Sequence, residues 1–113
     1  MSGRAFDRVE ALGLTLPDVD ADTKYDGSRV LKRGGAFMAG MAMHASAEPE
    51  TLVVRMTAED REHLLADAPD TYYITDYYQP HPVVLARLPR LDRDALHDLL
   101  SVSWRLTSAK ARR

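Results

Sequence analysis

Residues 29–43 have the sequence RVLKRGGAFMAGMAM, in which two strand-like runs flank a Gly-Gly pair. Adjacent glycines between such runs are typical of a two-residue hairpin turn, because this turn needs positive φ at its centre. The pattern therefore predicts an antiparallel hairpin with strands over 29–33 and 36–43. Alternate residues of the second strand are predicted to share one face: Phe37, Ala39, Met41 and Met43.

The residues before this hairpin predict a helix followed by a loop. Apolar residues recur at helical spacing, with Ser2 as a plausible N-cap and Gly13 at the C′ position. Leu14 to Asp22 is predicted to form a loop around Pro17. The apolar residues on the helical face are Ala5, Phe6, Val9 and Leu12.

The residues after the hairpin predict three more strands and two more helices. Residues 52–56 form an apolar strand, and Thr57 begins a sequence that resembles a capping box ahead of a short helix. Residues 72–75 and 83–88 are predicted to be two further strands. Asp92 is expected to cap a final helix with a broad apolar face.

The predicted order is α-β-β-β-α-β-β-α, which indicates an α+β fold: an antiparallel sheet of about five strands with helices packed on it. The 113 residues suffice for one domain, residues 1–113, with one core. No apolar run approaches the roughly 20 residues that span a bilayer, so we expect no membrane partner. The first residues, MSGRAFDRVE, carry acids where a signal peptide has an apolar core, and this favours a cytoplasmic location.

Several kinds of catalytic and cofactor site have no counterpart in the sequence. The chain has no cysteine, which excludes disulfides, thiolate metal sites and a cysteine nucleophile. Gly34 and Gly35 lack the spacing of a phosphate-binding loop, and no serine lies in a G-x-S-x-G sequence. The sequence therefore predicts a protein that is not an enzyme and that needs no cofactor or metal.

The net charge of −2 is unevenly distributed along the chain. Residues 83–113 hold seven bases and three acids, and a basic tail from about residue 107 ends the sequence. One interpretation is that these cations complement the dipole of the last helix and continue into a solvated tail. The other is that they contact a polyanion. The bases after Asp98 are Arg105, Lys110, Arg112 and Arg113.

Tyrosines are concentrated in residues 71–88, TYYITDYYQPHPVVLARL. Tyr77 and Tyr78 are predicted to lie at a turn beside His81. Their rings either cover the sheet edge with wet hydroxyl groups or form a surface on which a ligand or a nucleic-acid base stacks. For His81 to act as a general base it would need a carboxylate partner, and Asp76 is the acid nearby in sequence.

Four cations lie on the predicted strands. Lys32 and Arg33 flank the hairpin tip, where a basic ribbon can track a phosphate backbone and where charge also serves solubility. Arg55 and Arg87 each interrupt an apolar strand. Each is therefore either paired with an acid or part of a binding face.

Over about Phe6 to Lys110 the chain resembles the MmcQ/YjbR family of small bacterial proteins. The resemblance rests on a leading helix that ends in a Leu-Pro segment and on the segments RVLKRGGAFMAGM, TLVVRM, AEDREHLL, APDTYYITDYY, VVLARL and DALHDLLSVSWRL. It implies a CyaY-like fold, also described as a double-wing DNA-binding fold, and members are commonly labelled predicted DNA-binding proteins. It also brings a frataxin-like alternative of weak metal binding, for which the acidic residues are Asp7, Glu10, Asp18, Asp20 and Asp22.

The sequence thus predicts a non-catalytic binding protein with nucleic acid, such as DNA, as the favoured ligand. The alternative is a protein-interaction or regulatory module without nucleic-acid contact, which the negative net charge favours. The candidate contact residues are Lys32, Arg33, Arg87, Tyr77, Tyr78, His81, Arg105 and Lys110.

Overall fold

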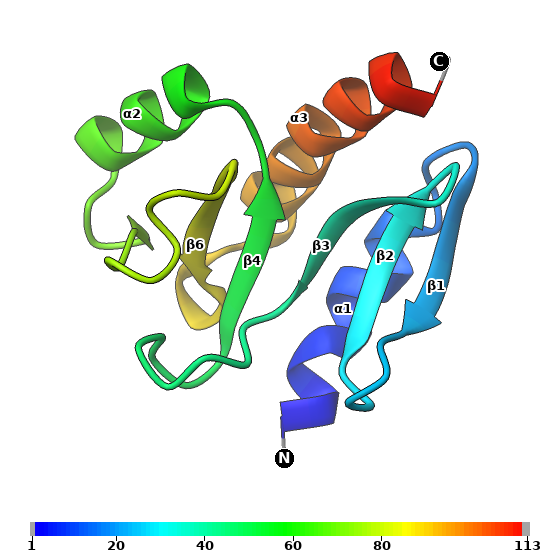
Figure 1. Cartoon of the computed structure of the whole chain (residues 1–113), viewed down its shortest axis with the longest axis horizontal. Coiled ribbons are helices and arrows are strands. Elements are labelled where there is room, and N and C mark those ends of the chain that lie inside the picture. The colour runs from blue at the N-terminus through cyan, green and yellow to red at the C-terminus, as the bar shows by residue number, and fades with distance from the viewer. Residues whose placement is uncertain (1, 112–113) are drawn as a thin grey trace.

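An antiparallel sheet with helices packed on one face organises the chain (Figure 1). The structure is a computed structural model that describes residues 2–111, with side chains described for residues 5–107. Within this part of the chain the sheet has six strands in the order β1-β2-β3-β4-β6-β5, and every neighbouring pair is antiparallel. The predicted α+β fold is confirmed.

The elements follow one another closely. They are α1 (Ser2–Gly13), β1 (Val19–Thr23), β2 (Arg29–Arg33), β3 (Ala36–Met41), β4 (Thr51–Arg55), α2 (Ala58–Asp67), β5 (Tyr72–Tyr73), β6 (Val83–Arg87), the short 3-10 helix η1 (Leu88–Arg90) and α3 (Arg93–Ala111). None of the helices in residues 2–111 has the length and apolar character needed to cross a membrane.

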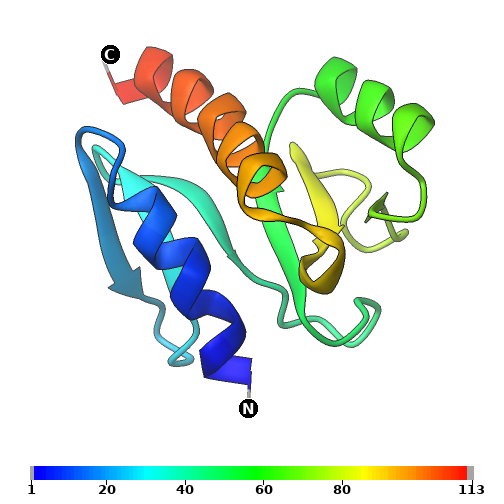
Figure 2. The same ribbon diagram turned by 180° about the vertical axis from the view of Figure 1, so that it is seen from behind.

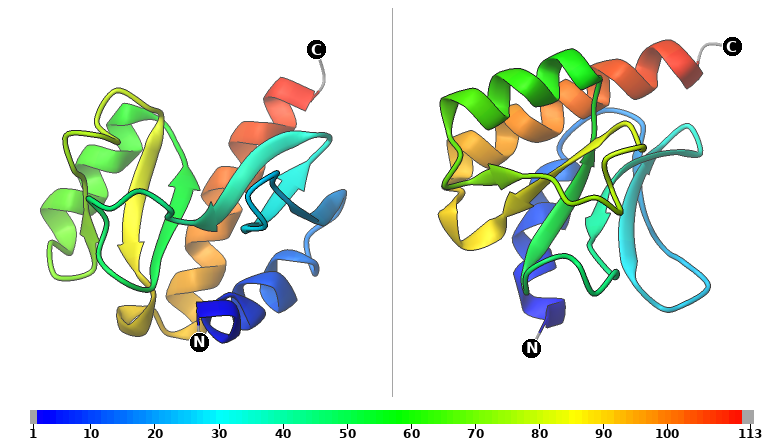
Figure 3. Two further views of the ribbon diagram at one scale, coloured as in Figure 1. Left: turned by 60° about the horizontal axis from the view of Figure 1, so that its bottom comes forward. Right: turned by 60° about the vertical axis from the view of Figure 1, so that its left-hand side comes forward.

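Helices α1 and α3 cover one face of the sheet, as Figure 2 shows, and we call the opposite face the open face. Figure 3 shows α2 beside the end of the sheet at which β4 ends. The core lies between the helices and the sheet, because burial of apolar side chains on the facing surfaces is the main stabilising contribution. Its buried members include Phe6 and Val9 of α1, Leu31, Leu52, Val54 and Val84 of the sheet, and Leu96, Leu99 and Leu100 of α3.

A β-bulge in β3 changes which side chains face the helices. Leu31 pairs with Ala39 and Lys32 pairs with Phe37, so Met38 is an extra residue without a partner on β2. Its carbonyl accepts a 2.9 Å hydrogen bond from the buried hydroxyl of Ser103 on α3, which satisfies a group that the bulge removes from the ladder.

The predicted shared face of the second hairpin strand is therefore wrong. Ala39 and Met41 pack in the core under the helices. Phe37 lies on the opposite side of the bulge and packs instead with Val53, Val83 and other residues of the open face. A period of two does not persist through an inserted residue.

Local signals placed the hairpin turn and the starts of α2 and α3 correctly. The predicted C′ role of Gly13 is wrong, because Gly13 is the last residue of α1 and does not have positive φ. Gly34 and Gly35 both have positive φ, at 57° and 82°, as the hairpin turn requires. Thr57 Oγ1 accepts a 3.1 Å hydrogen bond from the amide of Asp60, and Asp92 Oδ1 accepts one of 2.8 Å from the amide of Ala95. Both predicted caps are confirmed.

Three strand predictions need correction. Strand β3 ends at Met41 and not at residue 43. Residues 19–22, predicted to belong to a loop, form with Thr23 the edge strand β1, of which Val19 alone is buried. Its sequence VDADT has almost no apolar pattern because the other side chains are exposed. Strand β5 is limited to Tyr72–Tyr73, shorter than the predicted 72–75, because the chain turns after it.

Leu99→Ala should lower the free energy of unfolding by about 2 to 5 kcal/mol, because Leu99 is 3% exposed and packs between α3 and the sheet. Urea denaturation of both proteins measures the difference. Leu14→Ala is the matched control, because Leu14 is 48% exposed and its truncation should change stability by no more than about 0.5 kcal/mol. Equal losses for the two variants would contradict the proposed core.

Candidate functional site

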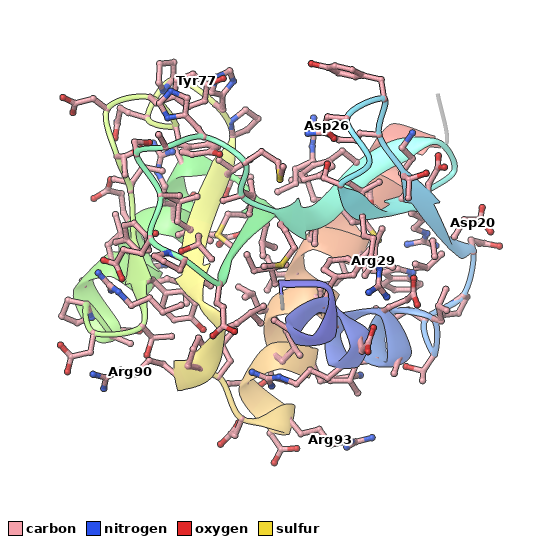
Figure 4. The ribbon with its side chains drawn as sticks, turned by 90° about the horizontal axis from the view of Figure 1, so that it is seen from below. Asp20, Asp26, Arg29, Tyr77, Arg90 and Arg93 are labelled. Atoms are coloured by element: carbon pink, nitrogen blue, oxygen red, sulfur yellow. The ribbon has the colours of Figure 1, made fainter. Side chains whose placement is uncertain are left out.

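A pocket of about 510 Å³ hollows the open face of the sheet. Figure 4 shows Tyr77 and Asp26 on this side of the molecule, on the β5–β6 and β1–β2 loops, with Arg90 and Arg93 on the opposite side. The floor consists of sheet residues: Val30, Phe37, Gly40, Val53 and Val83. The rim residues include Lys24, Tyr25, Asp26, Met43, His44, Tyr77, Tyr78 and His81, and Arg55 completes the wall.

Three of the predicted contact residues meet in this pocket as an aromatic cluster. The ring of Tyr77 stacks on His44 with centroids 3.5 Å apart and planes 9° apart. Tyr78 meets Tyr77 edge to face at 5.0 Å, and the ring of His81 lies 6.0 Å from Tyr77. Tyr77 is still 51% exposed, so one face of a pre-oriented aromatic ring is available to a ligand.

The hydroxyl groups of Tyr73 and Tyr78 hold the β3–β4 loop (residues 42–50) in place. The hydroxyl of Tyr73 accepts a 2.8 Å hydrogen bond from the amide of Glu48 and lies 2.6 Å from Thr51 Oγ1. The hydroxyl of Tyr78 accepts a 3.3 Å bond from the amide of His44. These bonds fix the position of His44, and thus of the ring stack, through the loop that carries it.

Arg87, one of the predicted contact residues, is engaged within the protein. Its guanidinium donates to both carboxylate oxygens of Glu48 at 2.9 and 2.8 Å and lies 4.3 Å from the Tyr73 ring centroid. It also donates to the carbonyls of Pro69 and Asp70. The bidentate hydrogen bond from Arg87 lowers the pKa of Glu48 below its ordinary value of 4.5. The sequence left open whether Arg87 pairs with an acid or belongs to a binding face, and in the structure it pairs with an acid.

The basic candidates do not gather on one surface. Lys32 pairs with Asp22 at 3.2 Å on the open-face side of β2. Arg33 points to the helices, where it stacks 3.8 Å from the Trp104 ring centroid and donates to the Trp104 carbonyl. Arg105 is exposed on α3, and the side chain of Lys110 lies outside the described residues. The hairpin tip therefore does not present the two adjacent free cations that a basic ribbon needs.

Arg55, unlike Arg87, has no acceptor for its guanidinium among the described residues. It lies at the other end of β4 on the same face, since Thr51 pairs with Arg87 and Arg55 with Val83. Its Nε is buried, and its guanidinium has no hydrogen bond or ion pair with any residue from 5 to 107. For this arginine pairing with an acid does not apply within residues 5–107, and its side chain lines the pocket.

Four of the five acidic residues considered for metal binding lie beside a base, and Asp20 is the exception within residues 5–107. Asp7 and Glu10 pair with Arg29 at 2.8 and 3.0 Å, and Asp18 lies 3.7 Å from Arg33. Among the described residues, no group of three histidine or acidic side chains is placed to hold a metal ion. In the same part of the chain no hydrogen bond joins His81 to Asp76.

Sequence reasoning did not identify Tyr25 and His44 as site residues. Tyr25 is fully exposed on the β1–β2 loop, and its neighbours Lys24 and Asp26 also line the pocket. Nothing in their local sequence distinguishes these residues from ordinary loop residues. His44, however, follows directly after the predicted hairpin strand, and that position is a weak signal that it lies at a strand end near Tyr77 and Tyr78.

Comparison of the chain with protein-family models, with curated proteins and with solved structures gives no match. The resemblance to the MmcQ/YjbR family therefore stays a prediction.

Glu48→Gln should reduce the acid sensitivity of the protein. Because the folded pKa of Glu48 lies below its unfolded value, its stabilising effect is present at neutral pH and is lost as the pH falls through the folded pKa. The unfolding free energy of the wild type should therefore fall more steeply than that of the variant between about pH 5 and pH 3.

Urea denaturation at a series of pH values checks this difference. Glu62→Gln is the control, because Glu62 is exposed on α2 and no pairing is found for it within residues 5–107. A pH profile of Glu48→Gln that superimposes on the wild-type profile would show that the Arg87 pair does not stabilise the fold in solution.

Proposed function

We propose that this protein is a non-catalytic, cytoplasmic binding module that takes single-stranded nucleic acid on the open face of its sheet. The observation that carries the proposal is the pocket, in which exposed aromatic rings lie beside cations on an apolar floor. Aromatic rings bind unpaired bases by stacking, which is worth about 1 to 3 kcal/mol per base and depends little on sequence. Cations beside the rings supply the complementary contact to phosphate.

The pocket offers two stacking positions on separate loops. Tyr77 is held by its stack on His44, so a base that covers its free face orders few additional side-chain torsions. Tyr25, which is fully exposed, stands on the β1–β2 loop of the same pocket. A strand that runs between the two loops would cross the sheet floor that includes Val53 and Val83, on the same face as Arg55.

The arrangement favours a single strand over a duplex. Bases in a duplex are stacked on one another and offer no free face to a tyrosine. Binding of duplex DNA by the hairpin would instead depend on Lys32 and Arg33, which are paired within the protein. The DNA-binding label of the MmcQ/YjbR family, which the chain resembles, is compatible with either form.

A protein-interaction module is the second candidate, and one observation favours it. Three of the large apolar side chains that are exposed in the described residues, namely Tyr25, Met43 and Tyr77, line the same pocket. Exposed aromatic and methionine side chains around a concavity are also typical of protein contact surfaces. In that case the partner would insert an apolar side chain where we place a base.

Fluorescence anisotropy with a labelled oligothymidylate strand and a duplex of equal length tests the proposal. We expect the single strand to bind more tightly, with an affinity that falls as salt rises by about 0.7 log units per log unit of salt for each phosphate contact. Tyr77→Ala should weaken binding by about 1 to 3 kcal/mol.

Two further variants act as controls. Tyr77→Phe keeps the ring and should bind nearly as well as the wild type. Lys32→Ala changes the hairpin tip, and it should weaken binding less than Tyr77→Ala does. If no single strand binds at tens of micromolar protein, the nucleic-acid proposal fails and the protein-interaction module takes its place.

A further inference from the structure

Arginines in this fold are matched with acceptors, and Arg55 is the exception among the partly or fully buried ones. Arg33 and Arg87 have carboxylate and carbonyl partners, and Arg29 pairs with Asp7 and Glu10. Arg61, which is 5% exposed, donates from Nη1 to the carbonyls of His81 and Val83 at 3.1 and 3.0 Å, although its Nε, like that of Arg55, has no acceptor among the described residues. Arg55 alone among these has no acceptor within residues 5–107.

An arginine in this state is unfavourable for folding. A buried donor that lacks an acceptor forfeits the hydrogen bond that water would supply, and a partly buried charge without a counterion is further penalised. A methionine or leucine at this strand position would pack on Val53 and Val83 without that penalty. The guanidinium is therefore suited to a group that is supplied from outside the chain.

The surroundings of Arg55 define the chemistry of that group. Its neighbours on the pocket floor, Phe37, Val53 and Val83, are apolar, and this raises the strength of a charge-assisted hydrogen bond. The planar fork of arginine matches an oxyanion with two parallel donors. The pocket also contains Asp26, but its Oδ1 already accepts from the amide and hydroxyl of Ser28, at 2.9 and 2.7 Å.

We infer that Arg55 is the oxyanion-binding residue of the pocket and that it receives a phosphate group of a ligand whose planar ring stacks on Tyr77. The inference rests on the proposed function in one respect, namely that the stacked ring is a nucleic-acid base. Two kinds of ligand could supply this phosphate: a nucleic-acid strand, through a phosphodiester, and a free nucleotide, through its phosphate group. Both place an oxyanion beside a planar ring.

The experiment compares binding of adenosine 5′-monophosphate, adenosine and oligothymidylate to the wild type, Arg55→Met and Arg55→Lys. We expect Arg55→Met to weaken nucleotide binding about tenfold or more, since a hydrogen bond to a charged group contributes about 1.5 to 3 kcal/mol. Adenosine should bind the wild type and Arg55→Met about equally. Arg55→Lys should recover part of the loss, because lysine keeps the charge but not the fork.

Two readouts separate this role from a merely structural one. Arg55→Met should melt at the wild-type temperature or above it, because the variant removes a donor that has no acceptor. In nitrogen-15 NMR spectra of the wild type, the Arg55 Nε–H resonance should move on addition of inorganic phosphate at constant ionic strength and stay in place with chloride. Arg90→Met removes the same charge on the opposite side of the molecule (Figure 4) and should leave both binding and melting unchanged.

The outcomes distinguish the inference from the proposed function. Loss of nucleotide binding in Arg55→Met, with no binding of oligothymidylate to any variant, supports the oxyanion site and a free nucleotide as its ligand. Equal binding of the strand to the wild type and Arg55→Met overturns the inference while single-strand binding stands. A large fall in the melting temperature of Arg55→Met, or an Nε–H resonance that ignores phosphate, also overturns it.

Discussion

The structure depends on the bulge at Met38, which divides the side chains of the sheet between two faces. An inserted residue moves every later side chain of its strand to the other face, so the bulge lets Met38 and Ala39 both enter the core. It also directs Phe37 to the open face. Ser103 of α3 bonds the Met38 carbonyl and thereby links the bulge to the helix that covers it. Core and pocket are two consequences of one register shift.

On the open face, two residues of the same type can differ in whether their polar groups are paired within the protein. The neighbours of each residue decide this difference. Arg87 and Arg55 occupy opposite ends of β4 and β6, yet one is saturated with acceptors and the other has none among the described residues. The hydroxyl of Tyr73 accepts a hydrogen bond from the β3–β4 loop, whereas the ring of Tyr77 is exposed to solvent. The half of this face near Arg87 is therefore stabilised by its polar groups. The half near Arg55 retains unused hydrogen-bonding and stacking capacity, and this makes it the candidate for binding.

Such a division is consistent with a general conflict between stability and function. A binding site needs groups that stay unsatisfied until the ligand arrives, and each of them lowers the stability of the free protein. Here neighbouring contacts offset the stability that the unpaired groups lose. The surrounding loops are held by the Glu48–Arg87 pair, by the tyrosine hydroxyls and by the hydrogen bonds from Arg61 to backbone carbonyls. A site held by such contacts suits the proposed binding module, which would bind without large rearrangement.

The sequence by itself determined the elements that depend on local chemistry. Gly34 and Gly35 specified the hairpin, Thr57 and Asp92 the helix starts, and the change of hydrophobic period the α+β class, because turns, caps and amphipathic faces involve residues close along the chain. Only the tertiary structure decided the bulge, the edge strand β1 and the site. Arg55 and Arg87 are alike in sequence, each at the end of an apolar strand. Their difference depends on whether a loop such as residues 42–50 brings a carboxylate to them, and that contact joins residues 39 positions apart.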